Sequence, residues 1–216
     1  QGYHCNDKNQ PLSCLEYNQK YGEHAAVFLG EGENVVLTFD EGYENGYTAS
    51  ILDTLKEKKV QAIFFVTYDY VKRNPELVER MIAEGHTVGN HTWSHPSLPD
   101  KSNADAAAEI TKLHAYVEEH FGYTMALFRP PMGEFSERTL EITKRQGYTS
   151  VFWSFAYRDY DVNDQPEPEK AFERVTSAVH PGAIYLLHAV SKTNDAILGR
   201  VIDAIREKGY AFTLLS

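Results

Sequence analysis

The chain has 216 residues, of which 42% are hydrophobic and 24% charged, and its formal net charge is −10. These values are ordinary for a soluble globular protein and fit one large domain, since α/β barrels commonly run to about 200–250 residues. The acidic balance and the lack of a Lys/Arg-rich run argue against a nucleic-acid partner, because a polyanion would be repelled. No stretch approaches the roughly 18 consecutive apolar residues of a transmembrane helix.

The first 32 residues are polar and rich in turns, without a lasting hydrophobic period. We therefore expect residues 1–32 to form an N-terminal extension and residues 33–216 to form the main domain. The chain starts at Gln1 without an initiating Met or an apolar leader, which indicates a mature or trimmed form. The only cysteines, Cys5 and Cys14, either close a small disulfide loop, as in exported proteins, or remain two thiols.

From residue 34 onward, short apolar strands alternate with helices. Strands are predicted at 35–39, 62–66, 86–88, 127–128, 149–152, 183–187 and 211–214. Helices are predicted at 51–59, 75–85, 102–120, 136–145, 167–179 and 195–208, and residues 154–166 form a polar, aromatic loop. Apolar runs of this kind are typical of parallel strands covered by helices. The order predicts either an incomplete (β/α) barrel or a doubly wound open sheet.

Polar residues follow the carboxyl ends of these strands. They are Asp40 and Glu41 after the first strand, His91 and His95 after the third, Arg129 after the fourth, Asp159 beyond the fifth and His188 after the sixth. Singly, each has a simpler structural role, such as a helix cap, a surface ion pair or a buried histidine. In a parallel α/β protein, however, these ends share one face, and their common placement there predicts an active site.

The residue types on this face suit metal-assisted hydrolysis. His91 and His95 are four residues apart, and on a helical turn both imidazoles would point to one side, as a divalent ion requires. A carboxylate and two histidines leave positions on the ion for water and a substrate carbonyl. A second carboxylate can act as general base, and a histidine on the opposite side can protonate the leaving group.

Four blocks of the sequence resemble, in order, those of the polysaccharide deacetylases of carbohydrate esterase family 4. The blocks are Thr38-Phe39-Asp40-Glu41-Gly42, His91-Thr92-Trp93-Ser94-His95, Arg129-Pro130-Pro131-Met132-Gly133 and Leu186-Leu187-His188. The resemblance covers roughly residues 33–215. It implies a distorted, incomplete (β/α) barrel of about seven parallel strands. It also implies removal of acetyl groups from N-acetylated glycans with a divalent metal, zinc or another ion such as cobalt or manganese.

By this resemblance, Asp40 is the general base and Arg129 orients it. His188 is the general acid, and Asp159 tunes it by raising its pKa. The backbone N–H of Met132 would help to stabilise the tetrahedral oxyanion, as donors aimed at developing charge do.

The expected metal ligands are His91, His95 and Glu41. The family usually has a second Asp where this chain has Glu41, which is one methylene longer. Glu41 therefore reaches the ion, reaches it poorly, or leaves it to the two histidines and water. A second departure is Tyr160, where the family usually has Trp.

In these departures the chain is similar to one branch of the family, the δ-lactam-forming muramic acid deacetylases of spore-forming bacteria. The runs Gly42–Gly46 and Val151–Ser154 also match that branch. It implies action on N-acetylmuramic acid stripped of its stem peptide, leading to muramic δ-lactam in the spore cortex. The expected partner is a peptidoglycan glycan strand. The expected location is outside the cytoplasm, secreted or associated with the cell wall or spore, and the chain is expected to be a monomer.

Other interpretations stay open. One is a deacetylase of N-acetylglucosamine in peptidoglycan or another glycan, and another is a glycan-binding domain weakened in catalysis by Glu41. A metallopeptidase is less favoured, because there is no H-E-x-x-H motif and Asn90 precedes His91. Five aromatic residues either stack on sugar rings or pack around the rim: Tyr68, Tyr70, Trp93, Phe155 and Tyr157.

Overall fold

The computed structural model describes residues 4–215. The strands are β1 (Ala26–Val27), β2 (Asn34–Glu41), β3 (Ile63–Val66), β4 (Thr87–Asn90), β5 (Leu127–Phe128), β6 (Thr149–Val151), β7 (Phe155–Ala156), β8 (Ile184–His188) and β9 (Ala211–Phe212). The α-helices are α1 (Leu12–Tyr21), α2 (Thr48–Glu57), α3 (Tyr68–Arg73), α4 (Pro75–Ala83), α5 (Asn103–Phe121), α6 (Glu137–Arg145), α7 (Pro168–Ser177) and α8 (Lys192–Glu207). Short 3₁₀ turns are η1 (Gly22–His24), η2 (Leu98–Asp100) and η3 (Pro131–Gly133).

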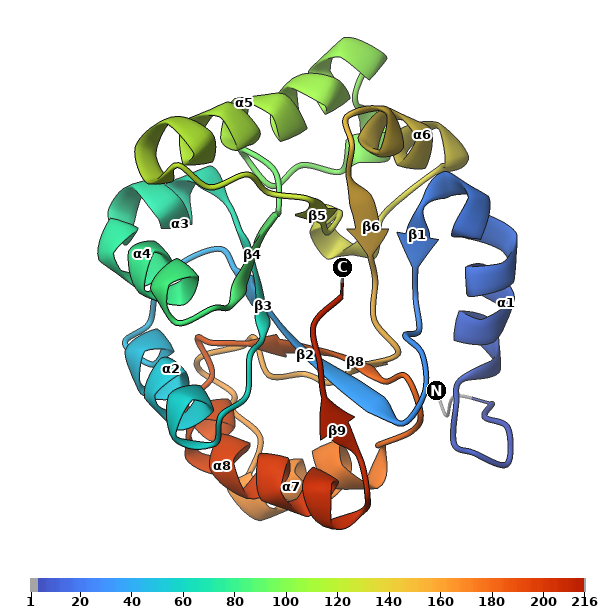
Figure 1. Ribbon diagram of the computed structural model, residues 1–216, viewed down its shortest axis with the longest axis vertical. Coiled ribbons are helices and arrows are strands. Elements are labelled where there is room, and N and C mark those ends of the chain that lie inside the picture. The colour runs from blue at the N-terminus through green and yellow to red at the C-terminus, as the bar shows by residue number, and fades with distance from the viewer. Residues whose placement is uncertain (1–3, 216) are drawn as a thin grey trace.

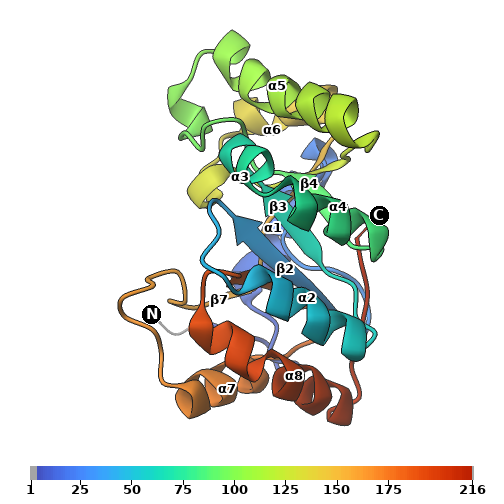
Figure 2. The ribbon, with the colours of Figure 1, turned by 90° about the vertical axis from the view of Figure 1, so that its left-hand side faces the viewer.

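These strands form one sheet in the order β1-β6-β5-β4-β3-β2-β8-β7, with β9 also paired to β2. All of these strand pairs are parallel. Figure 1 shows the curled sheet with the helices arranged around it. β1 and β7 are the first and last strands of the sheet order. Figure 2 shows α5 and α6 at one end of this view and α7 and α8 at the other. The prediction of an incomplete (β/α) barrel is confirmed.

Two strands of the sheet were not predicted. β1 lies within the expected N-terminal extension and pairs with β6, while β7 lies within the expected loop and pairs with β8. Each has only two residues, which is too short to show a hydrophobic period. The sheet therefore has nine strands among the described residues instead of about seven.

The N-terminal segment packs on the domain through α1. Cys14 lies in a small apolar cluster that also contains Phe28 and Phe152. Cys14 is buried and Cys5 is exposed, with no disulfide between them. Burial raises the pKa of the Cys14 thiol to about 11.

No helix within residues 4–215 is long and apolar enough to cross a membrane.

Alternate residues of β2 face opposite sides of the sheet. Leu37 and Phe39 belong to the large core beneath the helices, whereas Val36 belongs to a separate cluster inside the barrel. Because side chains alternate along a strand, Asp40 shares the inner side with Val36, and Glu41 turns toward the helices. The strand thus separates two adjacent carboxyl groups.

Candidate active site

A cavity of about 540 Å³ opens where the strands of the sheet end. Its lining includes most of the predicted site residues, namely Asp40, His91, His95, Met132 and His188, together with Tyr160. A larger hollow of about 950 Å³ lies around β9 and the end of α2, and its lining contains none of the predicted site residues. The smaller cavity is therefore the candidate active site.

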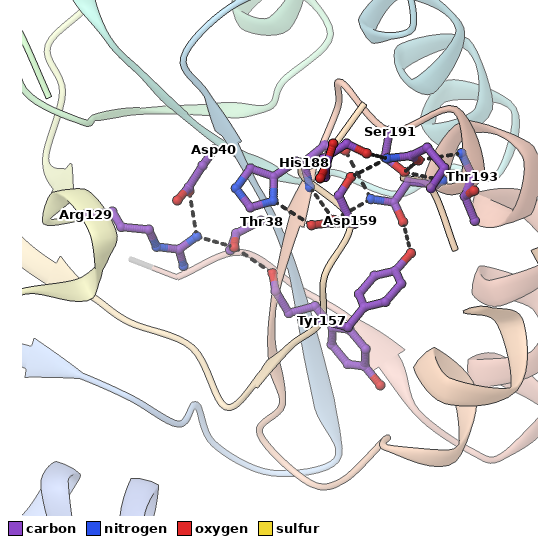
Figure 3. A network of polar contacts seen from close by, with 12 residues as sticks. Thr38, Asp40, Arg129, Tyr157, Asp159, His188, Ser191 and Thr193 are labelled. Carbon is purple, nitrogen blue, oxygen red and sulfur yellow. Dashed lines mark hydrogen bonds and ion pairs between the residues drawn. The ribbon is translucent and has the colours of Figure 1, made fainter. Parts of the chain in front are cut away.

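Arg129 is completely buried and lies behind Asp40, a lining residue of this cavity. Its Nη1 donates to Asp40 Oδ1 at 2.9 Å and to Thr38 Oγ1 at 2.6 Å (Figure 3). Its Nε and Nη2 donate to the carbonyl oxygens of Val151 and Phe152. Every nitrogen of the guanidinium is hydrogen-bonded, which a buried charge requires. The arginine thus holds the Asp40 carboxylate in one orientation.

Asp40 stays ionised in this setting. Burial alone would raise the pKa of its carboxyl, but the charge and hydrogen bond of Arg129, together with the charge of His188, outweigh burial and lower the pKa. The other carboxylate oxygen of Asp40, Oδ2, is not the one bonded to Arg129, and it lies 3.6 Å from His91 Nε2. Asp40 is therefore a carboxylate aimed into the cavity.

His188 lies beside Asp40, because the two residues are paired in the register of β2 and β8. Its Nδ1 donates to Asp159 Oδ1 at 2.7 Å, and its backbone N–H donates to Oδ2 at 2.8 Å. Burial would lower the pKa of His188, but the hydrogen bond to Asp159 and the charges of Asp159 and Asp40 outweigh it and raise the pKa. The imidazolium form is favoured, as expected for a general acid.

Asp159 is itself completely buried and depends on partners that the sequence did not reveal. Asn194 on α8 donates to Asp159 Oδ2 at 2.6 Å and to the His188 carbonyl at 3.0 Å. The Tyr157 hydroxyl donates to the Asn194 side-chain oxygen (Figure 3). Asn194 also occupies the first turn of α8, where such residues commonly serve as local caps, so nothing in the sequence distinguishes its second role.

His91 and His95 converge without a helix between them, contrary to the helical turn assumed from their spacing. Their ring centroids are 4.9 Å apart. Residues 91–97 follow β4 as a loop in which Thr92 (φ 73°) and His95 (φ 58°) adopt left-handed conformations. Such conformations cost about 1–3 kcal/mol each for residues other than glycine. The loop is therefore strained, and other contacts must hold it.

His91 has the protonation state that a metal ligand needs. Its Nδ1 lies 2.7 Å from the carbonyl oxygen of Arg129, which makes Nδ1 the protonated nitrogen and leaves the lone pair on Nε2, beside Asp40. Burial is the main cause that lowers its pKa to about 4. A second hydrogen bond from a ligating imidazole to a carbonyl is the usual arrangement around protein-bound metals. The two imidazoles lie in one cavity and fit a divalent ion with two protein ligands.

Glu41 does not join the two histidines, which corrects the expected ligand set. Within residues 4–215, no group of three His, Cys, Asp or Glu side chains is placed to hold a metal ion. Glu41 is fully buried and does not line the cavity, and neither carboxyl oxygen has a hydrogen-bond partner. The nearby Thr48 hydroxyl donates instead to Glu44. Burial raises the pKa of Glu41 well above its ordinary value, so the protonated form is favoured on the helix side of β2.

Met132 lies at the mouth of the cavity in η3, with a left-handed backbone (φ 59°) and an exposed side chain. Gly133 and Glu134 donate the hydrogen bonds of this turn. Of the five aromatic residues expected either to stack on sugar rings or to pack around the rim, Trp93 lines the cavity, stacked on Tyr68 with centroids 3.6 Å apart. The aromatic residues exposed at the mouth are instead Tyr43 and Tyr160.

Comparison with known proteins identifies the family of this chain. The family model for polysaccharide deacetylase matches residues 30–151, more than half of the chain. The chain is 42% identical over 205 residues to the peptidoglycan-N-acetylmuramic acid deacetylase PdaA of Bacillus subtilis (strain 168), covering 94% of this chain and 78% of that protein. It is 33% identical over 183 residues to the peptidoglycan-N-acetylglucosamine deacetylase PgdA of Listeria monocytogenes (strain 10403S), covering 85% of this chain and 38% of that protein.

The solved structure of Bacillus subtilis PdaA, a family 4 carbohydrate esterase, has a TM-score of 0.91 with this structure and 39% sequence identity. The match covers 99% of this chain and 93% of that chain. The chain therefore belongs to the polysaccharide deacetylase family, and it is a deacetylase enzyme of the family 4 carbohydrate esterase type.

Proposed function

We propose that this enzyme removes N-acetyl groups from peptidoglycan, acting on N-acetylmuramic acid residues stripped of their stem peptide and leading to muramic δ-lactam in the spore cortex. The observation that carries the hydrolytic activity is the pair Asp40 and His188. The two are neighbours in register and share one cavity, with the carboxylate favoured on one and the imidazolium on the other. The similarity to PdaA supports the choice of sugar. A peptidoglycan substrate also supports a location outside the cytoplasm.

The proposed reaction begins with Asp40, which takes a proton from a water attacking the acetyl carbonyl carbon. The tetrahedral oxyanion then accepts a hydrogen bond from the backbone N–H of Met132. His188 donates the proton on Nε2 to the leaving nitrogen, since its Nδ1 is committed to Asp159. The C–N bond breaks, and acetate and a free amine are released.

Asp40 is a weak base because its pKa is lowered, so proton transfer to it requires an acidified water. A divalent ion held by His91 and His95, with zinc first among the candidates, would acidify water and polarise the substrate carbonyl. Water or substrate would complete its coordination, because Glu41 is fully buried and does not line the cavity. Activity should therefore depend on a loosely held ion that a chelator removes.

The test is mass spectrometry of acetate release from defined, peptide-stripped peptidoglycan fragments, with and without chelator. Loss of the base or acid should reduce turnover by about 10²–10⁴-fold, so Asp40→Asn and His188→Ala should be nearly inactive. Asp53→Asn and His120→Ala, which change exposed residues on α2 and α5, are the matched controls. Full activity in either site variant would overturn the mechanism.

The cavity also favours a second candidate, a deacetylase of N-acetylglucosamine. Among the described residues, its lining contains no Lys or Arg, and its His188 imidazolium is already assigned as the acid. The lactyl carboxylate of muramic acid therefore finds no further cationic side chain there, whereas N-acetylglucosamine has no such group. The same assay decides between the two sugars, because the position of the lost acetyl group identifies the residue attacked. Release from N-acetylglucosamine alone would overturn the muramic acid assignment and keep the hydrolytic mechanism.

A further inference from the structure

The loop that carries the two histidines forms hydrogen bonds within itself that keep its unusual shape. The Thr92 N–H donates to Asn90 Oδ1 at 2.9 Å, and the His95 N–H donates to Thr92 Oγ1 at 3.0 Å. A positive φ at Thr92 is rare because its side chain is β-branched. Since a strained backbone persists only where surrounding structure over-determines it, contacts from outside the loop are expected.

Those outside contacts come from Glu109 in the first half of α5. Its Oε2 accepts from the Ser94 N–H at 2.8 Å, and its Oε1 accepts from the Ser94 hydroxyl at 2.7 Å. The backbone carbonyl of Glu109 also accepts from the Trp93 N–H at 3.0 Å. One residue of a regular 19-residue helix therefore binds two consecutive residues directly before His95.

The two histidine rings are held differently. His91 is anchored through its own ring, which bonds to the Arg129 carbonyl. Among residues 4–215, no hydrogen bond reaches the ring of His95, so the backbone on either side of it sets its direction. That backbone is fixed at Ser94 by Glu109.

We infer that Glu109 is a positioning residue that orients His95 as a ligand and thereby sets the affinity of the site for its divalent ion. This inference rests on the proposed function, in which His91 and His95 hold that ion. With only two protein ligands, the orientation of each one matters more than in a site with three. Loss of a residue that orients a ligand typically weakens metal affinity by about 10–100-fold.

The experiment is calorimetric titration of the metal-free protein with Zn²⁺, with hydrogen exchange of the Ser94 amide as a readout that needs no metal. Glu109→Ala should weaken Zn²⁺ binding by about 10–100-fold and speed exchange at Ser94. Glu109→Gln should lie between, because its amide keeps one acceptor oxygen of two. Glu119→Ala removes an exposed carboxylate from the same helix and should match the wild type.

A second substitution isolates the contact. Ser94→Ala removes the hydroxyl and keeps the N–H, so it should weaken Zn²⁺ binding less than Glu109→Ala. In the Glu109→Ala background it should add nothing, because the two groups form one interaction. Saturating Zn²⁺ should restore most of the deacetylase turnover of Glu109→Ala, since the residue acts through a ligand and does not touch the substrate.

Three results would overturn the inference. Unchanged Zn²⁺ affinity in Glu109→Ala would remove the role of Glu109 while leaving the proposed function intact. A lower Tm with unchanged affinity in the folded protein would reduce Glu109 to a structural contact. A wild-type protein that binds neither Zn²⁺ nor Co²⁺ would instead defeat the metal assignment itself, and the role of Glu109 with it.

Discussion

Replacing Glu41 by methionine tests whether this residue is a metal ligand or a buried acid. If it is a ligand, Glu41→Met weakens ion binding and lowers activity. If it is the neutral acid that the structure places on the helix side of β2, the ion and the reaction are unaffected, and the protein becomes more stable. The two readings predict opposite changes in one variant.

The size of the effect follows from the environment of the carboxyl group. Both oxygens of Glu41 are buried without a hydrogen-bond partner. An unsatisfied buried polar group costs about 1–3 kcal/mol, and methionine removes it with little change in volume. In a chain of this length, each kcal/mol corresponds to roughly 2–4 °C in Tm. Below pH 4.5, where the carboxyl is protonated in both the folded and the unfolded state, Glu41→Met should therefore raise Tm by about 2–12 °C.

The gain should depend on pH in a direction fixed by the raised pKa of Glu41. A group whose pKa is higher in the folded state stabilises fully below its unfolded pKa, here 4.5, and loses that contribution as the pH rises toward the folded pKa. Between those two values the wild type loses about 1.4 kcal/mol per pH unit relative to a residue that does not titrate. The advantage of Glu41→Met should thus be smallest below pH 4.5 and grow toward neutrality.

Thermal denaturation of wild type, Glu41→Met and Glu41→Gln across this pH range measures the effect. Glu41→Gln abolishes titration and keeps a buried polar group, so it should remove the pH dependence without the full gain. Zn²⁺ titration and acetate release should match the wild type in both variants. A loss of metal affinity in Glu41→Met, together with a lower Tm, would refute the placement of Glu41 outside the metal site.

Other perturbations have equally defined outcomes. Asp159→Asn removes the main cause that raises the pKa of His188, so burial should lower it, and the alkaline limb of the pH–activity profile should move to lower pH. Arg129→Met leaves the Asp40 carboxylate buried without its cation. It should destabilise the fold by about 3–5 kcal/mol in denaturant titrations, and an unchanged unfolding midpoint would contradict this account. Gly89→Ala places a Cβ 2.4 Å from a phenylalanine ring of β3, so it should lower stability by about 1–3 kcal/mol in the same titration. Dialysis against a chelator should abolish acetate release, and added Zn²⁺ should restore it.

The barrel could be predicted because its central strands are long and uniformly apolar. β2 and β8 are buried along most of their length, and their runs of apolar residues predict this burial from the sequence. β1 and β7 contain two residues each, and their place in the sheet comes from pairing with distant strands. Short edge strands of this kind carry no local signal, since tertiary contacts alone define them.

The site was predictable where strand ends determine it and not where loops do. The positions of Asp40 and His188 follow from the register of two parallel strands. The path between His91 and His95 does not, because the same spacing is compatible with a helix and with the observed left-handed loop. The contact of Glu109 with that loop joins residues 15 positions apart, and no hydrophobic period in the sequence predicts it.

The pKa values of two adjacent carboxyl groups, Asp40 and Glu41, are shifted in opposite directions in this enzyme. The two-residue period of β2 turns Asp40 toward a buried guanidinium, which keeps it charged, and turns Glu41 into the helix-facing core, which keeps it protonated. A one-residue slip in the register of β2 would exchange the environments of Asp40 and Glu41. The charge of the catalytic base is therefore set by strand register together with Arg129, and the identity of the side chain alone does not determine it.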